Sequence, residues 1–178
     1  PTCSATFYKY TTEWTQIYEE KLLPEEKAKI LDAFEKSFKE ISFELLTIPY
    51  GDILEDRNTQ ITFSALGQKA PIELKLNWDP GCIKRQELKK NLEKYISEFE
   101  IKLGGTTSID VTRKGIDKAY GIRQIEKHLG ISKEEMLYIG DALFEGGNDY
   151  PVKQAGVDCI ETSGPEKTKK IILGILKP

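Results

Sequence analysis

The clearest chemical pattern in this sequence lies in residues 140–149, which read GDALFEGGND. Asp141 directly follows an apolar run that predicts a buried strand, and ligands collect at the carboxyl ends of strands in an open parallel sheet. The two glycines permit a sharp turn, Asn148 suits a helix N-cap, and Asp149 is thereby held near Asp141. Carboxylate and amide oxygens are hard ligands that bind Mg²⁺ together with water and phosphate. The pattern therefore predicts a metal site at Asp141 and Asp149.

A structural role alone would also explain either half of this pattern. An aspartate commonly ends a strand, and Asn148 and Asp149 commonly cap a helix. The two halves together, with paired glycines between them and a strand-loop-helix context around them, favour the metal site over the structural role.

Helices and strands alternate around this segment. The sequence predicts a helix over about 117–129, a strand over 136–139, a short helix from residue 148, a strand over 157–161 and a helix from about residue 165. A capping box formed by Ser163 and Glu166 marks the start of the last helix. Such alternation predicts a parallel, doubly wound sheet.

Residues 1–112 show a different pattern. The expected elements are a hairpin over 4–19, a helix over 24–41, a β segment over 53–66, a helix after residue 81 and two strands over 99–103 and 106–112. In the β segment, the polar side chains of Gln60, Thr62 and Ser64 alternate with apolar ones, so we expect the polar face to lie in water. The short connections favour an antiparallel sheet covered by two helices.

The spacing from Gly140-Asp141 to Gly147-Asn148-Asp149 resembles the fourth motif of haloacid-dehalogenase (HAD)-type phosphotransferases. The wider run from residue 104 to residue 160 is similar to the type IIB subgroup, which contains eukaryotic phosphomannomutases and sugar-phosphate phosphatases. The resemblance implies an α/β fold in which a partial HAD-like Rossmannoid core carries an α+β type C2 cap. It assigns residues 1–18 to a core-edge hairpin, 19–112 to the substrate-specificity cap and 113–178 to the C-terminal half of the core.

The resemblance also implies catalytic roles for Lys118, Asp141 and Asn148, with Mg²⁺ as the cofactor. It places the lysine of the family's third motif at Lys118 rather than at the neighbouring Lys114. Because the helix dipole opposes an ammonium group at a helix N-terminus, anionic partners must hold Lys118 there. A transferring phosphoryl group and a nucleophilic carboxylate are such partners.

The cap positions that match substrate contacts in this family are Arg57, Ser108 and Asp110. Arg57 matches an arginine that holds the distal phosphate in phosphomannomutases, and the other two match sugar-contacting positions. Two further phosphate-binding arginines of the mutases align with Gln68 and Lys75. These two residues make a weaker phosphate clamp, so the resemblance implies hydrolysis of a sugar phosphate, with phosphomannomutase chemistry as the alternative.

Enzymes of this family attack phosphate with the first aspartate of a D-x-D-x-T motif, and these 178 residues contain no D-x-D. We therefore expect the nucleophile to lie on a segment outside the chain, separated from it by proteolysis, gene splitting or cloning. The chain alone is then expected to be inactive. The incomplete sheet predicts self-association or a complementing N-terminal segment. The alternative from another class is a binding module or pseudoenzyme that lacks a nucleophile.

Composition argues against several other classes of protein. The chain has 26 basic and 29 acidic residues and a net charge of −3, with both signs interspersed, so we expect no nucleic-acid partner. No apolar run approaches the ~20 residues needed to span a bilayer, so we expect no membrane partner. The 3 cysteines are widely spaced and fit a reducing compartment. We expect a cytoplasmic protein that binds a small phosphosugar.

Overall fold

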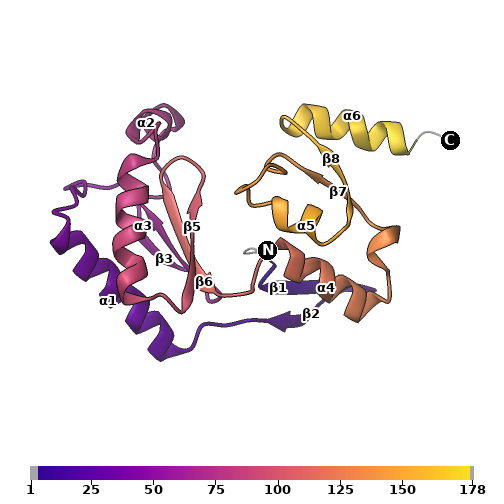
Figure 1. Ribbon diagram of the computed structural model, residues 1–178, viewed down its shortest axis with the longest axis horizontal. Helices are drawn as coiled ribbons and strands as arrows, with labels where there is room; N and C mark the ends of the chain where they lie inside the picture. The colour runs from indigo at the N-terminus through magenta and orange to yellow at the C-terminus, as the bar shows by residue number, and fades with distance from the viewer. Residues whose placement is uncertain (1–3, 177–178) are drawn as a thin grey trace. The chain divides into compact units, whose positions relative to one another are not determined.

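The computed structural model describes residues 4–176 of the 178-residue chain. The chain divides into two compact units, Pro1–Gly115 and Ile116–Pro178, which we call the N-terminal unit and the C-terminal unit (Figure 1). Each unit has its own hydrophobic core.

The N-terminal unit is built on antiparallel strands. Its elements are β1 (Thr6–Tyr10), β2 (Trp14–Glu19), α1 (Pro24–Glu40), β3 (Leu54–Asp56), β4 (Gln60–Ser64), α2 (Ile72–Trp78), α3 (Ile83–Tyr95), β5 (Phe99–Gly104) and β6 (Ser108–Arg113). Strands β1 and β2 form a hairpin, and the other strands form an antiparallel sheet in the order β3-β4-β6-β5. This architecture confirms the predicted α+β fold of this part of the chain.

The core of this unit lies between the sheet and helices α1 and α3 (Figure 1). Ile30 and Phe34 occur at four-residue spacing on α1, and the rings of Phe34 and Phe63 on β4 lie 5.7 Å apart between centroids. Leu88 and Leu92 enter the same core from α3 at the same spacing. Residues four apart share one face of a helix, so the apolar periodicity of the sequence sets which face packs on the sheet.

The segment between the first long helix and the second contains two features that the periodicity does not specify. The β segment is two strands, β3 and β4, joined by a turn in which Asn58 has a φ of 65°. Helix α2 was not predicted. Its apolar residues Ile72, Leu74 and Leu76 alternate, which is not a helical spacing, and none of its residues is buried.

The polar face of β4 is buried, so the prediction that it lies in water was wrong. Gln60, Thr62 and Ser64 are each at most 2% exposed. Strand β4 lies between β3 and β6, and its polar side chains form hydrogen bonds to a side chain of the neighbouring strand β6. Gln60 Nε2 and Thr62 Oγ1 donate to Asp110 Oδ1 on β6 at 3.0 and 2.7 Å. The alternation of polar and apolar residues identifies the two faces of a strand. It does not show whether the polar face lies in solvent or in a buried hydrogen-bonded network.

A buried ion pair ties the start of α3 to the turn between β5 and β6. Arg85 Nε donates to Asp79 Oδ2 at 3.0 Å, and both side chains are buried. Arg85 Nη1 also donates to the carbonyl oxygens of Gly104 and Gly105 at 3.1 and 2.9 Å. A buried guanidinium requires partners for its donors, and here they fix the turn that joins two strands of the sheet.

The C-terminal unit contains a parallel βαβ arrangement. Its elements are α4 (Lys118–Leu129), the 3₁₀ turn η1 (Lys133–Glu135), β7 (Leu137–Gly140), α5 (Tyr150–Gln154), β8 (Asp158–Glu161) and α6 (Pro165–Ile175). Strands β7 and β8 pair in parallel with Leu137 opposite Asp158. Ile122, Val152 and Val157 form a small core. This alternation of helix and parallel strand is the predicted one.

Two helix starts in this unit differ from the prediction. Helix α5 begins at Tyr150, so Asp149 and not Asn148 is its N-cap residue. Helix α6 has Gly164 as its N-cap, and the predicted capping box at Ser163 is not formed. Both helices carry a proline in their first turn, where its fixed φ favours a helix start and where its missing N–H is not needed.

Within residues 4–176, no helix is both long enough and apolar enough to cross a bilayer.

Replacing Arg85 with alanine should lower the free energy of unfolding by about 3–5 kcal/mol, because it leaves the carboxylate of Asp79 buried without its counter-ion. Urea unfolding would measure this loss. The control is Lys89→Ala on the same helix, whose more exposed pair with Glu93 is expected to contribute less than about 1 kcal/mol. Equal losses in the two variants would contradict the role given to Arg85.

Candidate active site at the end of strand β7

A buried carboxylate and a lysine join the starts of two helices in the C-terminal unit. The side chain of Asp149, the N-cap residue of α5, is 1% exposed, and that of Lys118, the first residue of α4, is 30% exposed. Lys118 Nζ forms an ion pair with Asp149 Oδ1. An ammonium group at a helix N-terminus requires an anionic partner, and Asp149 is that partner.

Two further donors hold the carboxylate of Asp149. Tyr138 OH donates to Oδ1 at 2.5 Å, and Ala142 N donates to Oδ2 at 3.0 Å. Burial alone would raise the pKa of Asp149, but these hydrogen bonds and that of Lys118 outweigh burial and hold the pKa below its ordinary value. Burial, and then the hydrogen bond to Asp149, raise the pKa of Tyr138, so its phenol remains a donor.

Two glycines of the predicted motif make room for this arrangement. A Cβ atom on Gly140 would lie 2.5 Å from Asp149 Oδ2 and 2.7 Å from Tyr138 Cε1. A Cβ atom on Gly147 would lie 2.1 Å from the carbonyl oxygen of Ala142. Atoms in a close-packed interior do not approach so closely, so a side chain at Gly147 would displace the loop backbone, and one at Gly140 would displace the carboxylate of Asp149 and the ring of Tyr138. These glycines therefore bring the loop and Asp149 against the end of β7.

A cavity of about 490 Å³ opens at the carboxyl end of β7. Its lining includes Lys118, Asp141 and Asp149, together with Thr162 and Gly164 from the β8–α6 connection and residues of α6. Asn148 also belongs to this group, because its Oδ1 accepts from Lys118 Nζ at 3.4 Å. The structure thus brings the predicted catalytic and metal-binding residues of the C-terminal unit to one place.

The donor set of this cavity fits a hard divalent cation such as Mg²⁺, which binds one or two protein carboxylates and completes its shell with water and phosphate. Asp141 is exposed at the cavity, whereas Asp149 has three of its roughly four lone-pair positions engaged by hydrogen bonds. Because it is exposed and its neighbour Asp149 is already bonded, Asp141 is the carboxylate better placed for direct ligation. Residues 4–176 contain no group of three or more His, Cys, Asp or Glu side chains arranged for a metal, so protein carboxylates alone would not complete the shell of the ion.

The sequence reasoning missed Tyr138 as a member of this site. The residue lies in an apolar strand and was counted only as part of that run. Two signals point to it: a buried tyrosine usually has a partner for its hydroxyl, and Tyr138 stands two positions before Gly140, on the same face of β7.

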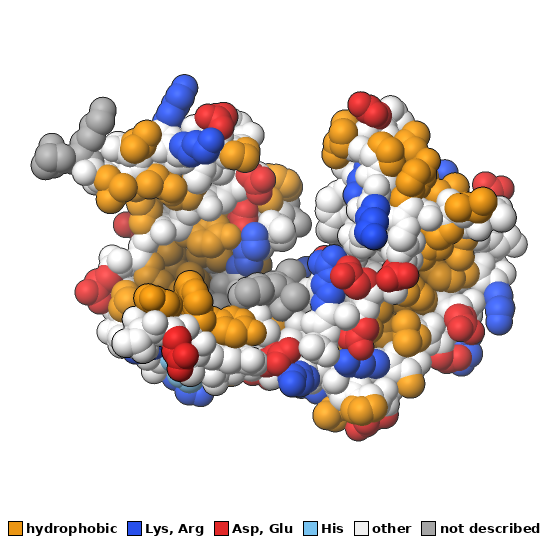
Figure 2. Space-filling model, turned by 180° about the vertical axis from the view of Figure 1, so that it is seen from behind, with side chains coloured by type: hydrophobic (Ala, Val, Ile, Leu, Met, Phe, Trp, Pro, Cys, Tyr) orange, Lys and Arg blue, Asp and Glu red, His pale blue; other side chains and the backbone are white. Residues whose placement is uncertain are grey.

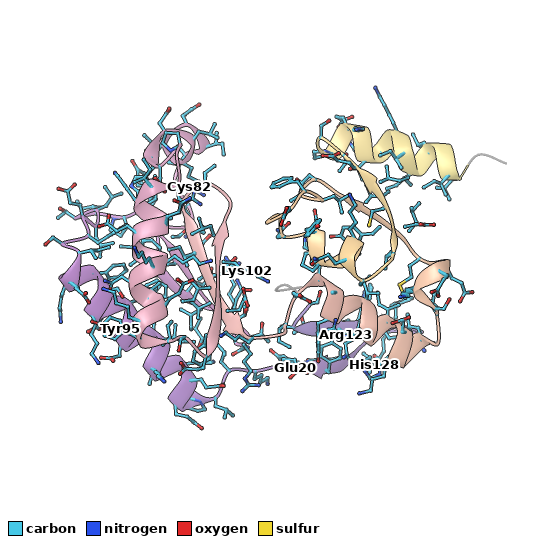
Figure 3. The ribbon with its side chains drawn as sticks, viewed as in Figure 1. Glu20, Cys82, Tyr95, Lys102, Arg123 and His128 are labelled. Carbon is cyan, nitrogen blue, oxygen red and sulfur yellow. The ribbon has the colours of Figure 1, made fainter. Side chains whose placement is uncertain are left out.

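The predicted substrate residues lie in the N-terminal unit. Ser108 and Asp110 are on the polar face of β6, where Ser108 Oγ lies 3.3 Å from Ser64 Oγ. Asp110 is opposite Lys102 of β5, which is labelled in Figure 3. These residues therefore form a row of hydrogen-bonding groups across the strands.

The other predicted substrate residues of this unit bond to one another or to their neighbours. Arg57 donates to Glu55 Oε2 through Nε and Nη2 at 2.8 and 2.7 Å. Lys75 Nζ donates to the carbonyl oxygen of Gln68 at 2.8 Å, and Gln68 Nε2 is buried without a hydrogen-bond partner. The structure therefore places Gln68 and Lys75 together, with Arg57 paired to a carboxylate.

Replacing Asp149 with asparagine should remove a pH-dependent part of the stability. The folded-state pKa of Asp149 lies below its unfolded value, so its contribution is present above the unfolded pKa, about 3.9, and is lost as pH falls through the folded pKa. The variant should be less stable than the parent chain at neutral pH, and the difference should shrink in acid.

Urea unfolding between pH 7 and pH 2 would measure this difference. Asp158→Asn, on the exposed end of β8, is the control and should change stability little at any pH. A difference for Asp149→Asn that stays constant over this range would contradict the account of its ionisation.

Comparison with known proteins identifies the family of the chain. Residues 3–178 match the family model described as eukaryotic phosphomannomutase. The phosphomannomutase of Encephalitozoon cuniculi is 30% identical over 168 residues, which cover 86% of this chain and 64% of that protein. The chain spans less than two thirds of the length of the curated relatives it matches first.

Solved structures share the fold at lower identity. An N-terminally truncated IMP-nucleotidase from Plasmodium falciparum superposes with a TM-score of 0.61 at 18% identity, over 97% of this chain and 48% of that one. A haloacid dehalogenase-like hydrolase from Bacteroides thetaiotaomicron gives 0.51 at 13% identity, over 91% of this chain and 70% of that one. These likenesses confirm the predicted fold. Residues 3–178 match the family model and the curated relatives are phosphomannomutases, so the chain belongs to the eukaryotic phosphomannomutase family.

Proposed function

We propose that this chain serves Mg²⁺-dependent phosphoryl transfer on a sugar phosphate, as the metal-binding and substrate-selecting part of a HAD-type phosphatase. The observation that carries the proposal is the pair of Lys118 and Asp149, which lies with Asp141 on one cavity at the end of β7. A cation and carboxylates at one cavity suit a phosphate and a metal ion together. Membership of a phosphomannomutase family supports a sugar phosphate as the substrate class.

Each residue of the cavity has its own role in this proposal. Asp141 and Asp149 belong to the metal site, with Asp141 as the direct ligand, and Asn148 holds the loop beside Lys118. Lys118 stabilises negative charge on the transferring phosphoryl group. Bound Mg²⁺ would neutralise phosphoryl oxygens.

The nucleophile in this proposal lies outside the chain. It is an aspartate that attacks phosphorus and forms an aspartyl-phosphate; the bond from phosphorus to the sugar oxygen breaks, and this oxygen takes a proton from the second aspartate of the D-x-D motif and leaves as the sugar hydroxyl. Water then hydrolyses the aspartyl-phosphate and releases inorganic phosphate. The 178 residues contain no D-x-D motif, so none of their aspartates is assigned this role.

The N-terminal unit supports hydrolysis over the mutase reaction. A mutase must hold a doubly phosphorylated sugar, and guanidinium groups are the best side chains for that task because they bind phosphate through two parallel hydrogen bonds. Here Arg57 is paired with Glu55, and the family resemblance aligns Gln68 and Lys75, which lie together, with two arginines of the mutases. Ser108 and Asp110 remain for the hydroxyl groups of one sugar. Isomerisation of a hexose phosphate without release of phosphate would support the mutase alternative.

The test is phosphate release from hexose phosphates with Mg²⁺, by the 178-residue chain alone and after joining it to a family N-terminal segment with D-x-D-x-T. The chain alone should be inactive, and the joined protein should turn over. Lys118→Ala should lower kcat of the joined protein by about 10²–10³-fold, because it removes a charge that stabilises the transition state.

Lys127→Ala, an exposed lysine on the same helix α4, is the matched control and should leave kcat unchanged. Equal rates for the two lysine variants would contradict the role of Lys118. Turnover by the chain alone would contradict the external nucleophile. An inactive joined protein that still binds hexose phosphate would favour a binding module.

We further propose that the C-terminal unit binds a complementing segment or a second copy of the chain. Among the described strands, β7 pairs only with β8, which leaves its other edge unpaired. Helix α6 exposes Ile172, Leu173 and Ile175 by 43–60%, and Figure 2 shows apolar side chains gathered along this helix at the upper left. Unpaired strand edges and apolar surface favour association.

Leu173→Glu should therefore weaken self-association of the chain alone, measured by sedimentation velocity over a concentration series. Lys170→Glu on the same helix changes charge without removing apolar surface and is the control. The joined protein should remain a smaller species than the chain alone at equal concentration. A chain that stays monomeric throughout, with the dye ANS unbound, would contradict this proposal.

A further inference from the structure

Tyr138 is the member of the cavity whose role the proposed function leaves open. It projects from the middle of β7, and its hydroxyl donates to Asp149 Oδ1 at 2.5 Å. The ring packs against the small core of Ile122, Val152 and Val157, while the residue also lines the cavity. A phenylalanine would pack in the same core, so the hydroxyl is the part that packing does not explain.

The hydroxyl acts on the oxygen of Asp149 that also receives Lys118. Oδ1 accepts from both Tyr138 and Lys118, and Oδ2 accepts from Ala142 N at 3.0 Å. These three donors come from helix α4, strand β7 and the loop after β7, and together they hold the carboxylate in one orientation. Because the side chain of Asp149 is only 1% exposed, bulk water is a poor substitute for a donor that is removed.

The contact between Tyr138 and Asp149 also depends on the absence of a side chain at Gly140. A Cβ atom on Gly140 would meet both Tyr138 Cε1, at 2.7 Å, and Asp149 Oδ2, at 2.5 Å. The ring and the carboxylate therefore occupy the volume that the glycine leaves open. The contact is part of the packing of the strand end and does not depend on a flexible side chain.

We propose that Tyr138 is a positioning residue: its hydroxyl fixes Asp149, and Asp149 in turn holds the ammonium group of Lys118 at the cavity. The inference rests on the proposed function for its importance in phosphoryl transfer, but its geometry stands without turnover. Tyr138 touches no reacting group in this role and acts only through Asp149.

The test is the lysine ¹⁵N–H₃⁺ NMR spectrum of the 178-residue chain, in which the Lys118 signal is assigned by its loss in Lys118→Arg. In the parent chain this signal should be visible, because the ion pair slows exchange of the ammonium protons with water. Tyr138→Phe should speed this exchange by about tenfold, since a hydrogen bond to a charged group is removed. The unfolding transition of the Tyr138→Phe variant should remain cooperative, as expected if the variant keeps its fold.

Two further variants separate positioning from a general loss of structure. Tyr18→Phe removes a hydroxyl that donates to the carbonyl oxygen of Ser4 at 2.9 Å in the N-terminal unit, and it should leave the Lys118 signal unchanged. In an Asp149→Asn background, Tyr138→Phe should have no further effect on exchange, because the residue through which it acts is already altered.

An unchanged Lys118 signal in Tyr138→Phe would overturn the proposal, as would the absence of a protected signal in the parent chain. An equal effect of Tyr138→Phe with and without Asp149→Asn would overturn it as well. None of these readouts needs turnover. A joined protein that is inactive while the spectra behave as expected would count against the proposed function alone.

Discussion

An ionised carboxylate removed from water is stable only where hydrogen-bond donors replace the solvent, and Asp149 meets this condition through donors from separate parts of the C-terminal unit. Lys118 reaches it from the start of α4, Tyr138 from β7 and Ala142 from the following loop. These contacts set the position of each element relative to the others at the end of β7. They also leave Asp141 and the ammonium group on one cavity, which is the arrangement on which the proposed chemistry depends.

The two units meet different physical demands. The N-terminal unit has an extensive apolar core between its sheet and two helices, so the opposite face of the sheet can carry polar groups. That face holds a hydrogen-bonded network around Asp110 rather than independent solvated side chains. The C-terminal unit has a small apolar core, and its apolar helix α6 is exposed. The polar contacts at the end of β7 therefore contribute more to holding the elements of this unit in place.

Sequence patterns predicted what depends on local spacing. The helix that contains Phe34 and the parallel βαβ order follow from periodicity and turn residues, and the placement of Lys118 and Asp149 in one site follows from the family resemblance, although the ion pair between them was not predicted. Helix α2 and the burial of Gln60 were missed, because both depend on the surrounding tertiary structure. The contact of Tyr138 with Asp149 was missed for the same reason: nothing in an apolar strand shows which side chain will meet a buried charge.

The most direct test of this account is a crystal structure of the joined protein with Mg²⁺ and a phosphate mimic such as tungstate. The account predicts the cation on the carboxylate of Asp141 and an oxygen of the mimic at roughly 3 Å from Lys118 Nζ, with Lys118 still in contact with Asp149. Binding of the mimic elsewhere, with Lys118 directed away from it, would contradict the central claim that this pair handles phosphate.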